Sequence, residues 1–160
     1  AIVGRKEVMD SAQASFISST FWTERIGPSA ALKTLEVMER EQSWIKITKT
    51  GKKIRSRFQE LSNKYQLKTS QTGLFALTSI IFHSNNAAAY KTLISQEMLK
   101  QGFLAGNNIY VCTKHNEKII NKYFDAIEPV FGLISECENG RDIRELLQGP
   151  ICHNGFKRLN

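Results

Sequence analysis

The sequence predicts an α+β fold in which a small, mostly antiparallel sheet carries helices packed on one face. Apolar residues recur at helical spacing in several segments, and the longest of these is 47–65. Other segments, above all 74–82, are rich in the β-branched and aromatic residues that favour strands. Each strand-like segment is separated from the next by a tight turn or by one helix, which favours antiparallel pairing.

The first part of the chain is predicted to be mainly helical. The run 1–4 indicates the end of a buried strand, and 6–13 indicates a short helix. A longer helix is expected to begin near Pro28, because proline is favoured at the first helical position. The residues Glu41-Gln42-Ser43 indicate a break, with Ser43 as the N-cap of the next helix.

The helix expected after this break has the clearest pattern in the sequence. Its apolar residues fall on one narrow stripe at about 100° per residue. They are Ile47, Ile54, Phe58, Leu61 and Tyr65. Lysines and arginines line an adjacent stripe. Gly51 interrupts the helix and is expected to weaken it by about 1 kcal/mol relative to alanine.

The remainder of the chain is predicted to alternate strands and helices. Two strands, 67–72 and 74–83, are expected around Gly73, and Ser84-Asn85-Asn86 are expected to cap a helix that ends at Gly102. The segments 103–104 and 109–112 are strand candidates. A further helix is expected from about 116 to 133, then a short helix at 142–148 and a basic tail.

Composition narrows the class of protein. The 160 residues suit one domain, and no apolar run approaches the roughly 20 residues that span a bilayer. The cysteines Cys112, Cys137 and Cys152 are odd in number and far apart, which argues against a disulfide framework and favours a cytoplasmic location. Because no histidine or cysteine cluster has metal-ligand spacing, no metal site is predicted.

Familiar catalytic and phosphate-loop patterns do not occur in the sequence. There is no Gly-x-Ser-x-Gly and no glycine-rich phosphate loop. Basic residues gather between Lys46 and Lys68, and such a patch attracts phosphates or an acidic partner. A stand-alone basic module for binding or dimerisation is therefore an alternative. Its aromatic residues are not interleaved with the basic stripe as a nucleic-acid platform requires.

A hydroxyl-rich turn precedes the helix that is expected near Pro28. Ser18, Ser19 and Thr20 offer hydroxyl and backbone N–H donors next to a helix start, where unpaired N–H groups favour an anion. Taken alone, the turn is read either as a helix cap or as a phosphate-binding site.

The order of these segments resembles the class III pyridoxal-phosphate (PLP) aminotransferases, in the glutamate-1-semialdehyde aminotransferase-like branch. The segment 1–9 resembles the strand and short helix that follow the cofactor lysine in that family. Ser19-Thr20 resembles its Gly-Thr turn, and 28–38 resembles its long linking helix. The segments 98–102, 109–112 and 117–130 resemble its closing helix, strand and helix, so that the similarity covers about residues 1–133.

This resemblance implies the C-terminal small domain of a fold-type I PLP enzyme. Residues 1–27 are then the end of the large cofactor domain, 28–133 the small domain with its linking helix, and 134–160 a C-terminal extension. The resemblance also implies a homodimer in which Ser19 and Thr20 bind the PLP phosphate, with Thr20 reaching the neighbouring subunit's cofactor. The substrate that the resemblance implies is a small molecule with an amino or keto group. Neither nucleic acid nor a membrane is expected as a partner.

The family's cofactor lysine has no counterpart in this sequence and is expected before Ala1. We therefore expect an aminotransferase fragment that is inactive alone and contributes no catalytic residue. The sequence departs from the family pattern at Thr23-Glu24-Arg25-Ile26, where Gly-Asn-Pro-Leu is common, and no acid stands at Gly106-Asn107-Asn108. The second departure favours an aminotransferase over a glutamate-1-semialdehyde 2,1-aminomutase fragment, which is the alternative within the family.

Overall fold

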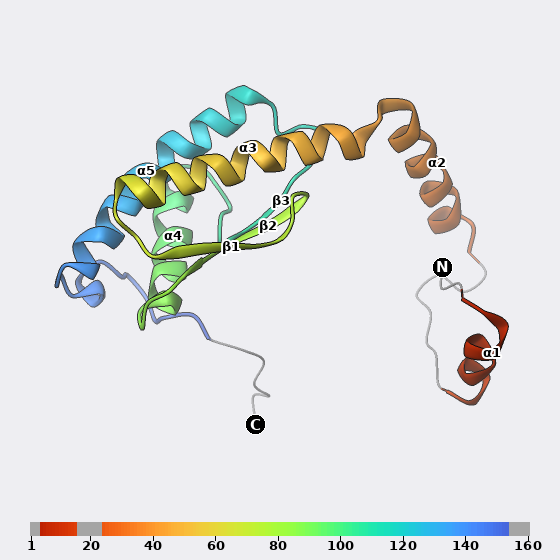
Figure 1. Ribbon diagram of the computed structural model, residues 1–160, viewed down its shortest axis with the longest axis horizontal. Helices are drawn as coiled ribbons and strands as arrows, with labels where there is room; N and C mark the ends of the chain where they lie inside the picture. The colour runs from red at the N-terminus through yellow and green to blue at the C-terminus, as the bar shows by residue number, and fades with distance from the viewer. Residues whose placement is uncertain (1–3, 16–23, 154–160) are drawn as a thin grey trace. The chain divides into compact units, whose positions relative to one another are not determined.

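The computed structural model of the chain describes residues 4–15 and 24–153, and the chain divides into two units (Figure 1). The first unit is Ala1–Glu41 and the second is Gln42–Asn160. The strand expected at 1–4 falls almost wholly outside the described residues. Among the helices in the described ranges, none is long and apolar enough to cross a membrane.

The described part of the first unit contains the two helical segments that the sequence predicts. Helix α1 (Lys6–Met9) continues into the 3-10 helix η1 (Asp10–Ala14), which together match the short helix expected at 6–13. Helix α2 (Ile26–Glu41) begins two residues before Pro28. Its large apolar side chains are exposed, and they are Ile26, Leu32, Leu35 and Met38.

The second unit begins at the predicted break. Gln42 has φ 50°, a left-handed conformation that separates α2 from helix α3 (Ser43–Lys64). The prediction that Ser43 caps α3 is wrong, because Gln42 holds the N-cap position and Ser43 is the first helical residue. The buried Ser43 hydroxyl has no hydrogen-bond partner within the described part of the chain.

The apolar stripe of α3 packs against helix α5 (Glu117–Glu138), and both predicted helices are confirmed. The Phe58 ring packs edge-on against Phe124 at a centroid distance of 5.0 Å and stacks on Phe131 at 6.1 Å. Helix α5 extends five residues beyond the expected end at 133. Its N-cap is Asn116, whose side chain accepts a hydrogen bond from the Ile119 N–H at 3.0 Å.

The sheet is antiparallel with the order β1-β2-β3, which confirms the predicted architecture. Its strands are β1 (Thr69–Leu74), β2 (Leu77–Phe82) and β3 (Asn108–Tyr110). Along β2, Thr78, Ile80 and Phe82 are buried. Phe82 packs against Tyr90 and Phe131, so the helices cover this face of the sheet.

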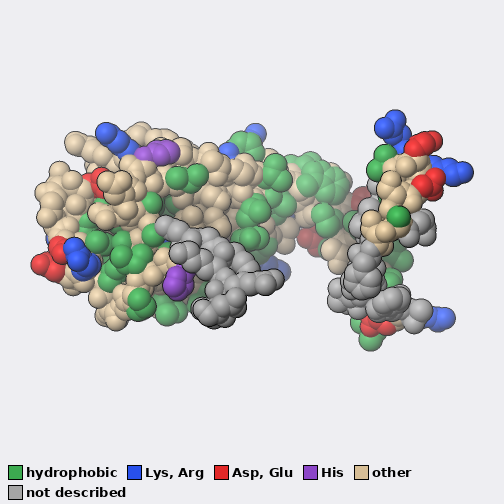
Figure 2. Space-filling model, turned by 90° about the horizontal axis from the view of Figure 1, so that it is seen from below, with side chains coloured by type: hydrophobic (Ala, Val, Ile, Leu, Met, Phe, Trp, Pro, Cys, Tyr) green, Lys and Arg blue, Asp and Glu red, His purple; other side chains and the backbone are tan. Residues whose placement is uncertain are grey.

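The opposite face of the sheet is open within the described chain. Its apolar side chains are more than a third exposed, and they are Leu74, Leu77, Ile81 and Tyr110. Figure 2 shows hydrophobic side chains, in green, exposed on the larger unit.

The hairpin turn between β1 and β2 differs from the prediction. The expected turn at Gly73 is wrong, because Gly73 lies within β1 and the turn residues are Phe75 and Ala76, closed by the pair Leu74 and Leu77. Gly73 has φ 83°, which explains why a glycine stands there. The strand expected at 103–104 is also wrong, because that segment is irregular.

Two further elements complete the second unit. Helix α4 (Ala87–Lys100) follows Ser84-Asn85-Asn86, and Gly102 with φ 80° lies just beyond its end, as predicted. The Ser84 hydroxyl accepts a hydrogen bond from the Asn86 N–H at 3.1 Å. The helix expected at 142–148 is shorter, a 3-10 turn η2 (Ile143–Glu145).

Candidate functional site

The start of α2 is the described segment nearest in sequence to the predicted phosphate site. Ser19 and Thr20 themselves lie outside the described residues. The Gly27 N–H donates to the Glu24 carboxylate at 2.6 Å, and the Ser29 N–H donates to the Arg25 carbonyl at 3.0 Å. Pro28 has no N–H to offer.

The start of α2 already has a carboxylate of the chain itself bound at a backbone N–H group. A helix start attracts an anion through free N–H groups, but at α2 the Glu24 carboxylate is already the anion that caps the helix. The prediction that residues 18–20 bind a phosphate therefore gains no support from the start of α2, and those residues lie outside the described part of the chain. Glu24 and Arg25, two of the departures from the family pattern, are both exposed.

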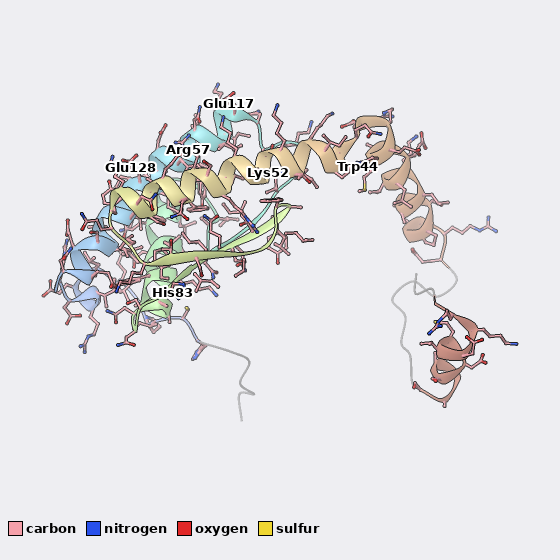
Figure 3. All side chains as sticks on the ribbon, viewed as in Figure 1. Trp44, Lys52, Arg57, His83, Glu117 and Glu128 are labelled. Atoms are coloured by element: carbon pink, nitrogen blue, oxygen red, sulfur yellow. The ribbon has the colours of Figure 1, made fainter. Side chains whose placement is uncertain are left out.

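The basic residues of α3 are largely engaged in packing the second unit. Lys53 pairs with Glu117 at 2.5 Å, and Lys64 pairs with Glu128. Figure 3 shows Arg57, Glu117 and Glu128 along the side where α3 and α5 run together. Hydrogen bonds from these lysines lower the pKa values of both glutamates. Two cations of the stripe therefore join α3 to α5, and this use argues against a stand-alone basic module that binds nucleic acid.

Arg55 holds the β1–β2 hairpin on α3. Its guanidinium donates to the Thr78 hydroxyl at 2.8 Å and to the Thr72 and Gly73 carbonyls at 2.9 and 2.5 Å. The same group lies 4.6 Å from the centre of the Phe75 ring. One planar cation thus satisfies carbonyls at the end of β1 while covering an aromatic ring of the turn.

The histidines show no catalytic arrangement in the described segments. His83 is exposed after β2, and His153 is exposed near the end of the described chain. His115 accepts a hydrogen bond from the Cys112 N–H at Nδ1, at 3.3 Å. Within the described residues, no group of three or more His, Cys, Asp or Glu residues is placed to hold a metal ion.

The pair of Tyr90 and Glu138 was not predicted from the sequence. Tyr90 has a relative exposure of 0%, and its hydroxyl donates to the Glu138 carboxylate at 2.5 Å. Burial and this hydrogen bond raise the pKa of Tyr90 to about 12, while hydrogen bonds from Ser84 and Tyr90 lower the pKa of Glu138. The two residues lie 48 positions apart, so no local pattern signals the contact.

An apolar cavity of about 290 Å³ lies between α3, α5 and the segment that leads into β3. Tyr123, one of its lining residues, has a buried hydroxyl without a hydrogen-bond partner in the described residues. Burial raises the pKa of this tyrosine, so it stays protonated. No sequence pattern indicates this cavity, because the segment 103–104 that borders it was expected to be a strand.

Comparison with known sequences finds partial similarity to aminotransferases. No protein-family model matches the chain. The chain is 27% identical over 136 residues to 3-aminobutyryl-CoA aminotransferase of Cloacimonas acidaminovorans, which covers 79% of this chain and 32% of that protein. It is 22% identical over 148 residues to glutamate-1-semialdehyde 2,1-aminomutase of Methanocaldococcus jannaschii, covering 82% and 34%. The chain thus spans about a third of the length of these curated relatives.

Comparison with solved structures gives the same fold. The PLP internal aldimine form of the FumI protein of Sphingopyxis sp. MTA144 matches 91% of this chain and 36% of its own, with a TM-score of 0.70 and 18% identity. A transaminase with PLP bound matches 59% of this chain and 24% of its own, with a TM-score of 0.50 and 20% identity.

The chain has the fold of one part of PLP-dependent transaminases. Both curated relatives are class III aminotransferases, and the resemblance to that family is confirmed.

Proposed function

We propose that the chain is part of a PLP-dependent aminotransferase that moves an amino group between an amino donor and a carbonyl acceptor. The observation that carries this proposal is the fold match over 91% of the chain to a PLP-containing protein. The two curated relatives, both of which act on amino-bearing substrates by name, support it. The aminomutase remains the alternative within the same family.

Transfer between two molecules is favoured over the aminomutase reaction. The relative with the higher identity is an aminotransferase, at 27% against 22% for the aminomutase. The segment Gly106-Asn107-Asn108, which leads into β3, carries no acid, and the Asn108 side chain accepts a hydrogen bond from the Ser79 hydroxyl at 2.7 Å.

PLP fits the donors that the chain offers before α2. Bound PLP supplies the electron sink that stabilises negative charge on the carbon bearing the amino group. Ser19 and Thr20 would hold the cofactor by donating hydroxyl hydrogens to its phosphate, which leaves the chemistry at the other end of the ring to residues outside this chain. Glu24, which caps α2, keeps that helix start from competing for the phosphate.

The remaining proposals follow from the resemblance. The complete protein acts as a homodimer in the cytoplasm, and Thr20 contacts the cofactor of the other subunit. The 160-residue chain alone turns over no amino donor, because the lysine that bonds the cofactor is supplied by another part of the protein. Turnover by this chain alone with added PLP would contradict that assignment.

The phosphate contact is tested in the complete protein that contains this chain. We expect Thr20→Val to weaken PLP binding about tenfold or more, the effect of losing a hydrogen bond to an anion. The matched control is Thr34→Val on α2, because the Thr34 hydroxyl donates to the Ala30 carbonyl at 2.8 Å instead of facing a ligand. Equal PLP affinity of the two variants would show that Thr20 does not bind the phosphate.

A further inference from the structure

A row of large side chains crosses the open face of the sheet at its hairpin end. Leu74 of β1 pairs with Leu77 of β2, and Leu77 pairs with Tyr110 of β3. Directly opposed residues of neighbouring strands point to the same face, so the three side chains form one continuous row. They are 75%, 38% and 72% exposed, respectively, so the described residues leave this row open to solvent.

The row continues into the apolar cavity between α3 and α5. Tyr110 belongs to both, because it ends the row and also lines the cavity. Two further lining residues, Leu104 and Ile119, are exposed as well. Single exposed apolar residues are ordinary on a protein surface, whereas a contiguous apolar patch marks an interaction surface. All of these residues belong to the second unit, so the surface is complete within that unit.

The open face carries no charged side chain at any position that the strand pairing fixes. These positions are Ser70, Thr72, Leu74, Leu77, Ser79, Ile81, Asn108 and Tyr110. In a chain with 23% charged residues this is a clear depletion, and the core of a protein interface is depleted in the same way. In the middle of the face the Ser79 hydroxyl donates to Asn108 Oδ1 at 2.7 Å, so these two polar groups bond to each other. The face therefore fits an uncharged, largely apolar partner surface.

The occupant follows from how much of each relative lies outside the match. The chain corresponds to 32% of one curated relative and 36% of one solved structure, so most of each of those proteins lies outside the matched part. A second copy of this chain is disfavoured, because each copy carries a formal net charge of +7 and the face has no charge to offset the repulsion.

We propose that the open face is the surface on which the remainder of the complete protein packs, with apolar side chains of that remainder entering the cavity beside Leu104. The inference rests on the proposed function, since it takes the chain as part of a longer enzyme. It adds to that function the surface that joins this part to the rest.

Hydroxyl-radical footprinting, which measures the oxidation rates of exposed side chains, tests the proposal. It is applied without added PLP to the 160-residue chain and to the complete protein that contains it. Leu74 and Tyr110 should be oxidised about threefold or more slowly in the complete protein, because residues in the core of an interface lose most of their exposure. Leu99 on α4 is the reference, because it is 59% exposed and neither lies on the open face nor lines the cavity. Equal rates for Tyr110 in the two proteins, or equal protection of Leu99, would overturn the proposal.

Other occupants give different results. Protection already present in the 160-residue chain at low concentration would assign the face to the chain itself, and protection that grows with its concentration would assign the face to a second copy. Either result overturns the proposal. A complete protein that protects Tyr110 but binds no PLP supports this inference and contradicts the proposed function. One that binds PLP and leaves Tyr110 open contradicts this inference alone.

A matched pair of variants gives an energetic test. Leu74→Asp places a charge on the open face, and Leu99→Asp places the same charge on the exposed surface of α4. Leu74→Asp should lower the thermal unfolding midpoint of the complete protein more than that of the 160-residue chain, because burying an unpaired charge is costly. Leu99→Asp should shift both midpoints by similar amounts. Similar shifts of the two proteins for Leu74→Asp would overturn the proposal.

Discussion

The backbone of Phe75 lies directly against Gly51. A Cβ atom added to Gly51 would stand 1.8 Å from the Phe75 carbonyl oxygen, much too close for any side chain. The glycine that weakens α3 in isolation is therefore the position at which the hairpin turn rests on the helix. Together with Arg55, this contact fixes the turn between β1 and β2.

Gly51→Ala should lower the free energy of unfolding by about 1–3 kcal/mol, because overpacking outweighs the gain in helix propensity. Gly132→Ala on α5 is the matched control, since its added Cβ meets only Tyr65 at an ordinary 3.5 Å. That variant should be as stable as wild type or up to about 1 kcal/mol more stable. Urea unfolding measures both, and an unchanged or raised stability for Gly51→Ala contradicts the contact.

Removal of the buried hydroxyl should change the free energy of unfolding differently at Tyr90 and at Tyr123. Tyr90→Phe should lower the free energy of unfolding by about 1.5–3 kcal/mol at neutral pH, because it removes a hydrogen bond to the charged Glu138. Tyr123→Phe should cost nothing or stabilise the chain, because that hydroxyl has no partner in the described residues. Chemical denaturation of the two variants measures this difference. Similar losses of stability in both variants would contradict it.

Alkaline pH gives a separate test of Tyr90. Its pKa is raised from 10.0 to about 12 in the folded chain, so the folded state holds the proton more tightly than the unfolded state. This contribution to stability is fully present below pH 10 and is lost as the pH rises towards 12. The stability of wild type should therefore fall more steeply between pH 10 and 12 than that of Tyr90→Phe. Parallel stability curves over this window contradict the assigned shift.

Arg55→Lys should destabilise the hairpin although it keeps the charge. An ammonium group does not reproduce the planar fork that reaches the Thr78 hydroxyl and two carbonyls together. We expect a loss of about 1–3 kcal/mol and faster hydrogen exchange in β1 and β2. Arg144→Lys is the control, because Arg144 is exposed and its side chain bonds to the carboxylate of Asp142, only two residues away. Equal exchange rates in the two variants would contradict the role of Arg55.

The features of the fold that depend on local periodicity were predicted correctly from the sequence. The stripe of Ile54, Phe58 and Leu61 is buried as expected, because apolar residues at helical spacing fix which face of α3 packs inward. The position of the hairpin turn depends instead on the cross-strand pair Leu74 and Leu77. The turn predicted from Gly73 was therefore placed wrongly. Leu104 is 97% exposed, and a pattern of two apolar residues was too short to distinguish an irregular segment from a strand.

The candidate site was less accessible to sequence reasoning than the fold. Contacts such as Tyr90 with Glu138 join residues far apart in the chain, and only the folded arrangement brings them together. The resemblance that pointed to PLP came from the order of segments rather than from one motif. Ser19 and Thr20, on which the phosphate assignment rests, remain a prediction because they lie outside the described residues.

Amino transfer itself is the most direct test of the central claim. The complete protein that contains this chain is loaded with PLP, and its absorption spectrum is followed after an amino donor and then a keto acceptor are added. The account predicts that the donor converts the bound cofactor to its amine form and that the acceptor restores it. A complete protein that takes up no PLP, or whose cofactor is unchanged by every donor in a panel of small amino compounds, would contradict it.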